Sequence, residues 1–342
     1  MNNVSTTGPP REAGTKEILG YVLAIIIILC LAFLGMSPKA GTFNGLDVFL
    51  VSLFLILIVV FIDLRLRIIE MNKTPSQNRV IQKITMQELL VRTVFRGKTT
   101  SDKLNLLGLN LLCLLPRRYV YKNPTLKRLT SALIEKTLIR ERGYTWNLNH
   151  PSQFHLISGE HEKQIAPWFN MYGDTFIDIG SNLGKYTLTL SRRFGQVYSF
   201  EPCKDTYNLL CRNIKLNKCT NIYPLNIAGW DDRCSLPLFR RITPGLNSLF
   251  LKDALVGTEQ VECWPLDNMD LDWGKIDLVK VDVEGAEYQV IHGMSELLMK
   301  HKPTLIIEIR PENQVTMNKL LRGLGFHLAD KHDMNYLWRP IT

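Results

Sequence analysis

The chain has 342 residues, of which 46% are hydrophobic and 21% charged. This composition excludes a disordered chain, a collagen-like repeat and a small disulfide-bonded scaffold, and the length suits one large domain with an appendage or two modest domains. Lys and Arg number 41 against 32 Asp and Glu, a net charge of +9. Residues 175–342 contain 20 basic and 20 acidic residues, so the whole excess (21 minus 12) lies in residues 1–174. The C-terminal half therefore carries no electrostatic signature of a nucleic-acid partner.

Two apolar segments near the N-terminus predict a membrane-spanning helical hairpin. Residues 18–36 are a run of 19 without charge, about 28 Å long as a helix, which is close to the hydrocarbon thickness of a bilayer. Residues 48–62 are a second run of 15, short for a span unless its ends snorkel. The turn-rich linker 37–45 suits a hairpin. The alternative is a signal peptide followed by a buried helix, but no small-residue cleavage site follows Met36.

The basic residues predict the orientation of this hairpin. The linker 37–45 has one Lys, whereas residues 64–142 contain 17 basic and 5 acidic residues, net +12. By the positive-inside rule, the protein is a multi-pass membrane protein whose long C-terminal portion faces the cytoplasm. We also expect residues 64–142 to contact anionic lipid head groups.

Two helices are predicted within this basic stretch. The apolar run 104–115 is too short to span a membrane and is expected to form a buried or in-plane helix. Asn123-Pro124 is expected to open another helix that ends near Gly143. The basic face of this helix is either an ordinary solvated face or a membrane-docking face.

From Gly173 onward, short β-rich apolar runs alternate with helical stretches, which predicts an α/β fold with a parallel sheet. The expected strands are residues 176–179, 197–200, 222–225, 278–283 and 305–309. Residues 325–328 and 335–338 are two further strand-like runs, which we expect to form a closing antiparallel hairpin. Strand-like pieces at 235–240 and 260–264 are expected to help shape an acceptor pocket.

The turn after the first strand, DIGSNLG at residues 178–184, predicts a cofactor site. Glycines there let a ligand approach the backbone, and the following helix presents free amides. Glu201 ends the next strand, 17 positions after Gly184, where a carboxylate can accept both hydroxyls of a ribose. The spacing is not that of a dinucleotide fingerprint, and Asp178 suits a cation better than a phosphate. S-adenosylmethionine supplies both an adenosine and a cation.

A second group of acidic residues lies in DLVKVDVEGAE, residues 277–287. Alternation places Lys280 and Asp282 on one side of the strand at its carboxyl edge, and Glu308 ends the next strand at the same height. Glu287 is interpreted as an acid that stabilises the start of the next helix, and for Glu284 this interpretation and a site role both stay open.

These segments together resemble the FkbM family of S-adenosylmethionine-dependent methyltransferases over roughly residues 159–342. The resemblance is carried by GDTFIDIGSNLGKYTL, VYSFEP, DLVKVDVEGAEYQVIHGM and LIIEI. It implies a class I methyltransferase fold, a Rossmann-like sheet closed by an antiparallel hairpin. By that likeness Glu201 holds the ribose and Asp282 lies by the acceptor. The residues expected at the cofactor turn are Asp178, Gly180, Ser181, Asn182 and Gly184.

The predicted organisation is an N-terminal tail at 1–16, a transmembrane hairpin at 17–70, a basic membrane-proximal helical region at 71–158 and a methyltransferase domain at 159–342. The expected reaction is O-methylation of a sugar, glycolipid or other amphiphilic small-molecule or glycan acceptor. Asp282 is the candidate base, Lys280 orients it, and Glu308 is a further candidate. The alternatives are a membrane-surface binding module with a vestigial cofactor pocket and an NAD-linked oxidoreductase, for which no hydride-transfer site is indicated.

No metal is expected. Asp282, Glu284 and Glu308 offer oxygen ligands in principle. However, the seven histidines show no metal-binding spacing, and the seven cysteines contain no C-x-x-C pair.

Overall fold

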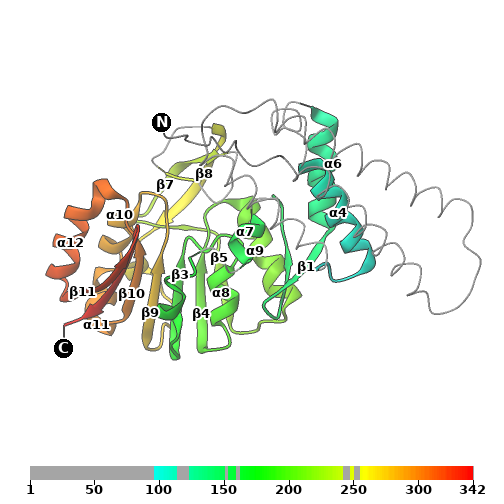
Figure 1. Cartoon of the computed structure of the whole chain (residues 1–342). Coiled ribbons are helices and arrows are strands. Elements are labelled where there is room, and N and C mark those ends of the chain that lie inside the picture. The colour runs from blue at the N-terminus through cyan, green and yellow to red at the C-terminus, as the bar shows by residue number, and fades with distance from the viewer. Residues whose placement is uncertain are drawn as a thin grey trace, which may run out of the picture. The chain divides into compact units, whose positions relative to one another are not determined.

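The computed structural model is coloured along the chain in Figure 1. It describes residues 96–113, 123–150, 153–158, 162–241, 247–249 and 255–341. The described residues fall within one unit, Ile81–Thr342. The predicted transmembrane hairpin at 17–70 lies outside them. Among the helices that are described, none has the length and apolar character needed to cross a membrane.

A seven-stranded sheet forms the centre of the described fold, in the order β11-β12-β10-β9-β3-β4-β5 (Figure 1). Its strands are β3 (Gly173–Ile179), β4 (Phe194–Phe200), β5 (Ile222–Leu225), β9 (Ile276–Val281), β10 (Thr304–Glu308), β11 (Phe326–His332) and β12 (Asn335–Pro340). The strands from β5 to β10 are parallel, and β12 is antiparallel to both β10 and β11. The predicted parallel sheet and its closing hairpin are confirmed.

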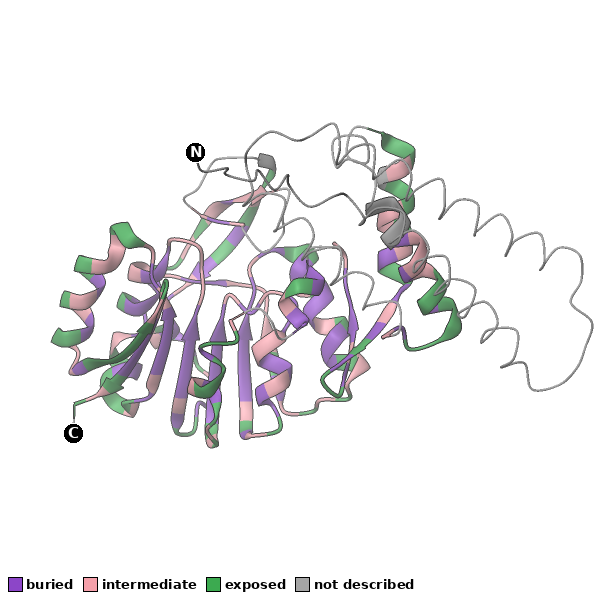
Figure 2. Ribbon diagram, viewed as in Figure 1, coloured by how far each residue is buried: buried purple, intermediate pink, exposed green. Residues whose placement is uncertain are grey.

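Helices cover both faces of the central strands β3, β4, β9 and β10, which are mostly buried, whereas the edge strand β11 is mostly exposed (Figure 2). Phe176 and Leu278 pack in one core with α8 (Lys185–Leu190) and α9 (Lys204–Leu216). Their neighbours Ile177 and Val279 pack in a second core, with side chains from three other helices. Those helices are α10 (Glu287–His292), α11 (Ser295–His301) and α12 (Gln314–Gly323).

The strand order reverses direction at β3. The chain passes from β3 to β4 and β5 on one side, and β9 and β10 lie on the other side. Ligands of open parallel sheets bind at such a reversal, beyond the carboxyl ends of the strands. A three-stranded sheet of β6 (Ala228–Gly229), β8 (Leu255–Trp264) and β7 (Cys234–Arg241) supplies further walls at this edge.

A β-hairpin replaces the end of the second predicted basic helix. Helix α4 (Thr100–Cys113) forms where a helix was expected, but α6 (Pro124–Lys136) ends before Gly143. The chain continues as β1 (Leu138–Glu141) and β2 (Tyr144–Asn147), which pair antiparallel. Arg142 and Gly143 have φ angles of 52° and 79°, so they form the two-residue turn that joins hairpin strands. The sequence signal for this turn is Gly143, followed by the strand-forming run Tyr144-Thr145-Trp146.

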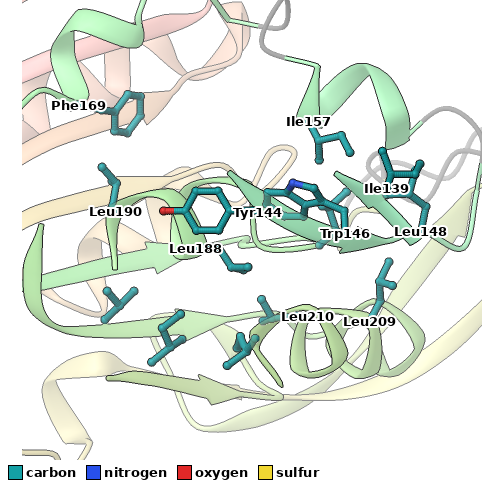
Figure 3. Close-up of a cluster of buried hydrophobic side chains, with 14 of the residues drawn as sticks. Ile139, Tyr144, Trp146, Leu148, Ile157, Phe169, Leu188, Leu190, Leu209 and Leu210 are labelled. Atoms are coloured by element: carbon teal, nitrogen blue, oxygen red, sulfur yellow. The ribbon is translucent and has the colours of Figure 1, made fainter. Parts of the chain in front are cut away.

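The β1–β2 hairpin belongs to the same hydrophobic core as the sheet. Figure 3 shows Tyr144 and Trp146 of β2 among Leu188 of α8 and Leu209 and Leu210 of α9. The short helices α7 (Gln153–Ile157) and η1 (Ala166–Phe169) contribute Ile157 and Phe169 to this cluster. Residues 138–150 and 153–157 therefore pack on the helices that follow β3 and β4.

Asn213 of α9 connects the hairpin to the turn after β3. Its side chain is fully buried; Oδ1 accepts from the Asn147 backbone N–H at 2.8 Å, and Nδ2 donates to the Leu183 carbonyl at 3.0 Å. We expect Asn213→Ala to lower the free energy of unfolding by about 2–4 kcal/mol, because it leaves both backbone groups buried without a partner. Denaturant unfolding measures this. The control Lys215→Ala, on the exposed face of the same helix, should change the value by less than about 0.5 kcal/mol.

Candidate active site

The turn between β3 and α8 has a backbone that requires glycine. Gly180 has a φ of 81°, and a Cβ there would lie 1.8 Å from the Asp282 carbonyl oxygen. Gly184 has a φ of 96°, and a Cβ there would meet the side chains of Leu188 and Leu210 at 2.6 and 2.7 Å. Asn182 has a φ of 52°, a conformation that Asn tolerates better than most residues. The turn therefore lies directly against the chain that leaves β9.

Glu201 closes this turn from the end of β4. Its Oε2 accepts from the Asn182 backbone N–H at 2.9 Å, and its Oε1 accepts from the Cys203 N–H at 3.0 Å. The side chain is 8% exposed, and this burial raises the pKa of the carboxyl to about 7, against the two backbone hydrogen bonds. A carboxylate oxygen has more than one acceptor position, so each oxygen can still accept from a ligand hydroxyl.

A cleft lies at the carboxyl edge of the sheet, with about 650 Å³ of empty space that is partly open to solvent. Gly180, Asn182 and Glu201 line it from the turn side, and Asp282 and Glu284 line it from the end of β9. Leu238 of β7 and residues 247–249 also line it. A cleft whose lining combines apolar side chains with a few converging polar groups is typical of small-molecule and cofactor sites.

Three of the predicted cofactor residues shape the turn instead of lining the cleft. Ser181 Oγ donates to the Phe200 carbonyl at 3.2 Å, and Gly184 packs against apolar side chains. Asp178 is 1% exposed, and its Oδ2 accepts from Thr187 Oγ1 at 2.6 Å. Burial raises the Asp178 pKa, although the nearby Lys280 charge opposes the shift. Its Oδ1 is buried and has no hydrogen-bond partner within the described parts of the chain.

Asp282, Lys280 and Glu308 lie together as the sequence predicts. Asp282 follows β9, which ends at Val281 rather than at residue 283, and its Oδ2 accepts from Lys280 Nζ at 2.9 Å. Burial acts to lower the Lys280 pKa, but the charges of Asp282 and Asp178 outweigh it and raise the pKa, so Lys280 stays protonated. The Asp282 charge and burial raise the pKa of Glu308 to about 8.

Glu284 and Glu287 interact with other partners. Arg310 donates to Glu284 Oε2, and this pair is mostly buried. Glu287 is the first residue of α10, and its two carboxylate oxygens accept from the Gly285 N–H at 2.8 Å and Asn313 Nδ2 at 2.9 Å. Both oxygens of Glu287 thus hold protein groups in place.

Glu162 is a site residue that the sequence did not indicate. One oxygen each of Glu162, Asp282 and Glu308 lie within 4.8 Å of one another, a spacing at which carboxylates can hold a cation. Lys185 and Lys280 already pair with Glu162 and Asp282 at 2.7 and 2.9 Å. The three carboxylates and these two lysines form a charge network.

Residues 178–328 match the family model described as the methyltransferase FkbM domain. "Methyltransferase 1" of Beauveria bassiana (strain ARSEF 2860) is 26% identical over 183 residues, 46% of this chain and 74% of that protein. "Methyltransferase sdnD" of Sordaria araneosa is 26% identical over 202 residues, 47% of this chain and 76% of that protein. The crystal structure of an FkbM methyltransferase from Methylobacillus flagellatus KT is 14% identical, with a TM-score of 0.38. The match covers 76% of this chain and 60% of that chain.

The sheet order, the cleft and the family match define the class: the chain carries a class I methyltransferase fold with a methyltransferase domain similar to the FkbM family. Its cofactor is S-adenosylmethionine. The described residues fit this cofactor. A Cβ at Gly180 would block the backbone approach, and Glu201 is a buried carboxylate with remaining acceptor positions at the cleft wall.

The raised Glu201 pKa predicts pH-dependent cofactor binding. Below its pKa of about 7 the carboxyl is protonated, and a protonated carboxyl accepts the ribose hydroxyls less well. We expect the affinity for S-adenosylmethionine to fall about tenfold from pH 8 to pH 6, in proportion to the ionised fraction. Calorimetry across this range measures it, and Glu201→Gln should bind weakly without this dependence. A constant wild-type affinity would exclude Glu201 as the ribose acceptor.

Proposed function

We propose that this protein transfers the methyl group of S-adenosylmethionine to a hydroxyl oxygen of its acceptor, with Asp282 as the general base. The observation that carries the proposal is the position of Asp282, which lines the cofactor cleft and also belongs to the charge network with Lys280 and Glu308. Its side chain is 28% exposed, so it is open to an acceptor. The family match supports the methyl transfer, and the base is assigned on this geometry.

The chemistry is a displacement in which the acceptor O–C bond forms as the C–S bond of the sulfonium breaks. S-adenosylmethionine, when bound, would supply the electrophilic methyl carbon, with the neutral thioether as the leaving group. The protein must align the acceptor oxygen and remove its proton. Asp282 takes this proton, and Lys280 holds the carboxylate in position through the 2.9 Å ion pair. Glu201, with Gly180 and Asn182, orients the adenosyl group from the turn side of the cleft.

We further propose that the acceptor is a sugar, a glycolipid or another amphiphilic molecule at a membrane. The two uncharged runs at 18–36 and 48–62 and the net charge of +12 over residues 64–142 support this part. The same features support attachment to the bilayer with the methyltransferase domain on the cytoplasmic side.

The test compares membranes from cells that express the full chain with membranes from cells that express Asp282→Asn. Both are incubated with methyl-labelled S-adenosylmethionine, and lipids and glycans are analysed by mass spectrometry. The expected result is a labelled species, heavier by one methylene, that depends on Asp282. Failure of the wild-type chain to bind S-adenosylmethionine would instead favour a membrane-surface binding module with a vestigial pocket.

A further inference from the structure

Glu162 reaches the charge network from outside the segment that matches the methyltransferase family. It precedes η1 in the chain, whereas the match begins at residue 178. Its φ is 57°, a left-handed conformation that is uncommon for a residue other than glycine and recurs at functional sites. Its side chain is only 11% exposed. The loop therefore holds a charged side chain inward, in an unfavourable backbone conformation.

The Glu162 carboxylate holds two side chains of α8. Its Oε2 accepts from Lys185 Nζ and from the Tyr186 hydroxyl, each at 2.7 Å. The Tyr186 ring stacks on Phe169 of η1 with centroids 4.1 Å apart. The ammonium groups of Lys185 and Lys280 lie 4.5 and 5.0 Å from the centre of the same ring. Glu162 thereby links its own loop to α8. The Tyr186 ring in turn contacts the ammonium group of Lys280 in β9.

The charges around Glu308 come from the end of β9, from the residues that follow it and from the loop that holds Glu162. Lys280 lies in β9, Asp282 is the residue directly after that strand, and Glu284 lies two residues further on. Glu162 comes from the loop before η1. Arg310 neutralises much of the Glu284 charge. What remains is three carboxylates within 4.8 Å of one another and two lysines. Like charges this close favour keeping a proton on one of the carboxyls.

We propose that Glu162 is a positioning residue of the methyl-transfer site, whose negative charge keeps a proton on Glu308, the carboxyl beside the base Asp282. This inference rests on the proposed function for its role in catalysis. Glu162 does not line the cofactor cleft. It acts on the acceptor's proton through Asp282, with Lys185 and Tyr186 held in place beside it.

The test is a pH titration of the full chain by infrared spectroscopy, which detects the C=O stretch of a protonated carboxyl. The band that Glu308→Gln removes identifies Glu308, and in the wild type it should disappear with a midpoint at about pH 8. The isosteric variant Glu162→Gln should lower this midpoint by at least about half a pH unit, because a neighbouring negative charge is lost. Glu312→Gln, which removes an exposed acid, should leave the midpoint unchanged.

An unchanged or higher midpoint in Glu162→Gln overturns the inference. Lys185→Met provides a second measurement if Glu162→Gln does not fold: without its lysine partner the Glu162 charge acts more strongly, and the midpoint should rise. Because the titration uses no acceptor, it succeeds or fails independently of methyl transfer. A lowered midpoint with no methylated product in wild-type membranes would count against the proposed function alone.

Discussion

Asp282→Asn should reduce methyl transfer by about 10²–10⁴-fold, the usual contribution of a general base. The amide keeps the size of the side chain but cannot take up the acceptor's proton. Binding of S-adenosylmethionine should stay close to wild type, because the Gly180 turn and Glu201 are unaltered. Initial rates measure the loss of turnover, and calorimetry measures the retained affinity.

The matched control for this substitution is Asp270→Asn, at an exposed position, which should leave both quantities unchanged. Denaturant unfolding of Asp282→Asn is also needed, because the substitution weakens the partner of the buried Lys280 ammonium. A variant that folds, binds the cofactor and turns over at the wild-type rate would remove Asp282 from the role of base.

Gly180→Ala should weaken S-adenosylmethionine binding by at least about 100-fold, the cost of a misplaced cofactor contact in a preorganised site. The added Cβ would lie 1.8 Å from the Asp282 carbonyl oxygen, a backbone atom, at a φ of 81°. The turn and the end of β9 must therefore move apart. The same strain should lower the free energy of unfolding by about 2–4 kcal/mol.

Gly257→Ala is the control for both effects. Among the described residues, apart from Gly257 and its chain neighbours, no atom lies within 4 Å of the Cβ position at Gly257, so neither affinity nor stability should fall. Calorimetry with S-adenosylmethionine and denaturant unfolding of the two variants measure the difference. Wild-type affinity in Gly180→Ala would show that the cofactor does not approach this part of the turn.

The sheet and the cofactor turn could be predicted because their signals are local. Apolar β-rich runs fix strands buried on both faces, and β5 has the predicted bounds, Ile222–Leu225. The glycines after β3 mark a turn wherever the rest of the chain lies. The β1–β2 hairpin was missed because a basic, helix-compatible segment hid the two-residue turn at Arg142-Gly143.

The pairing of Lys280 with Asp282 also followed from the sequence, since alternation along a strand places such residues on one side. The hydrogen-bond partners of Asp178 and Ser181 could not be predicted from the sequence. Both side chains bond to neighbouring elements at Thr187 and Phe200, and which polar groups a helix or strand brings alongside depends on how the layers pack.

Thus the amino-acid order alone determined the strands and the glycine-bearing turn after β3, because each depends on φ preferences and on the burial of nearby residues. The meeting of Glu162 with Asp282 and Glu308 was decided only in three dimensions. These residues are far apart in the chain, and their charges are set by packing that removes water from between them.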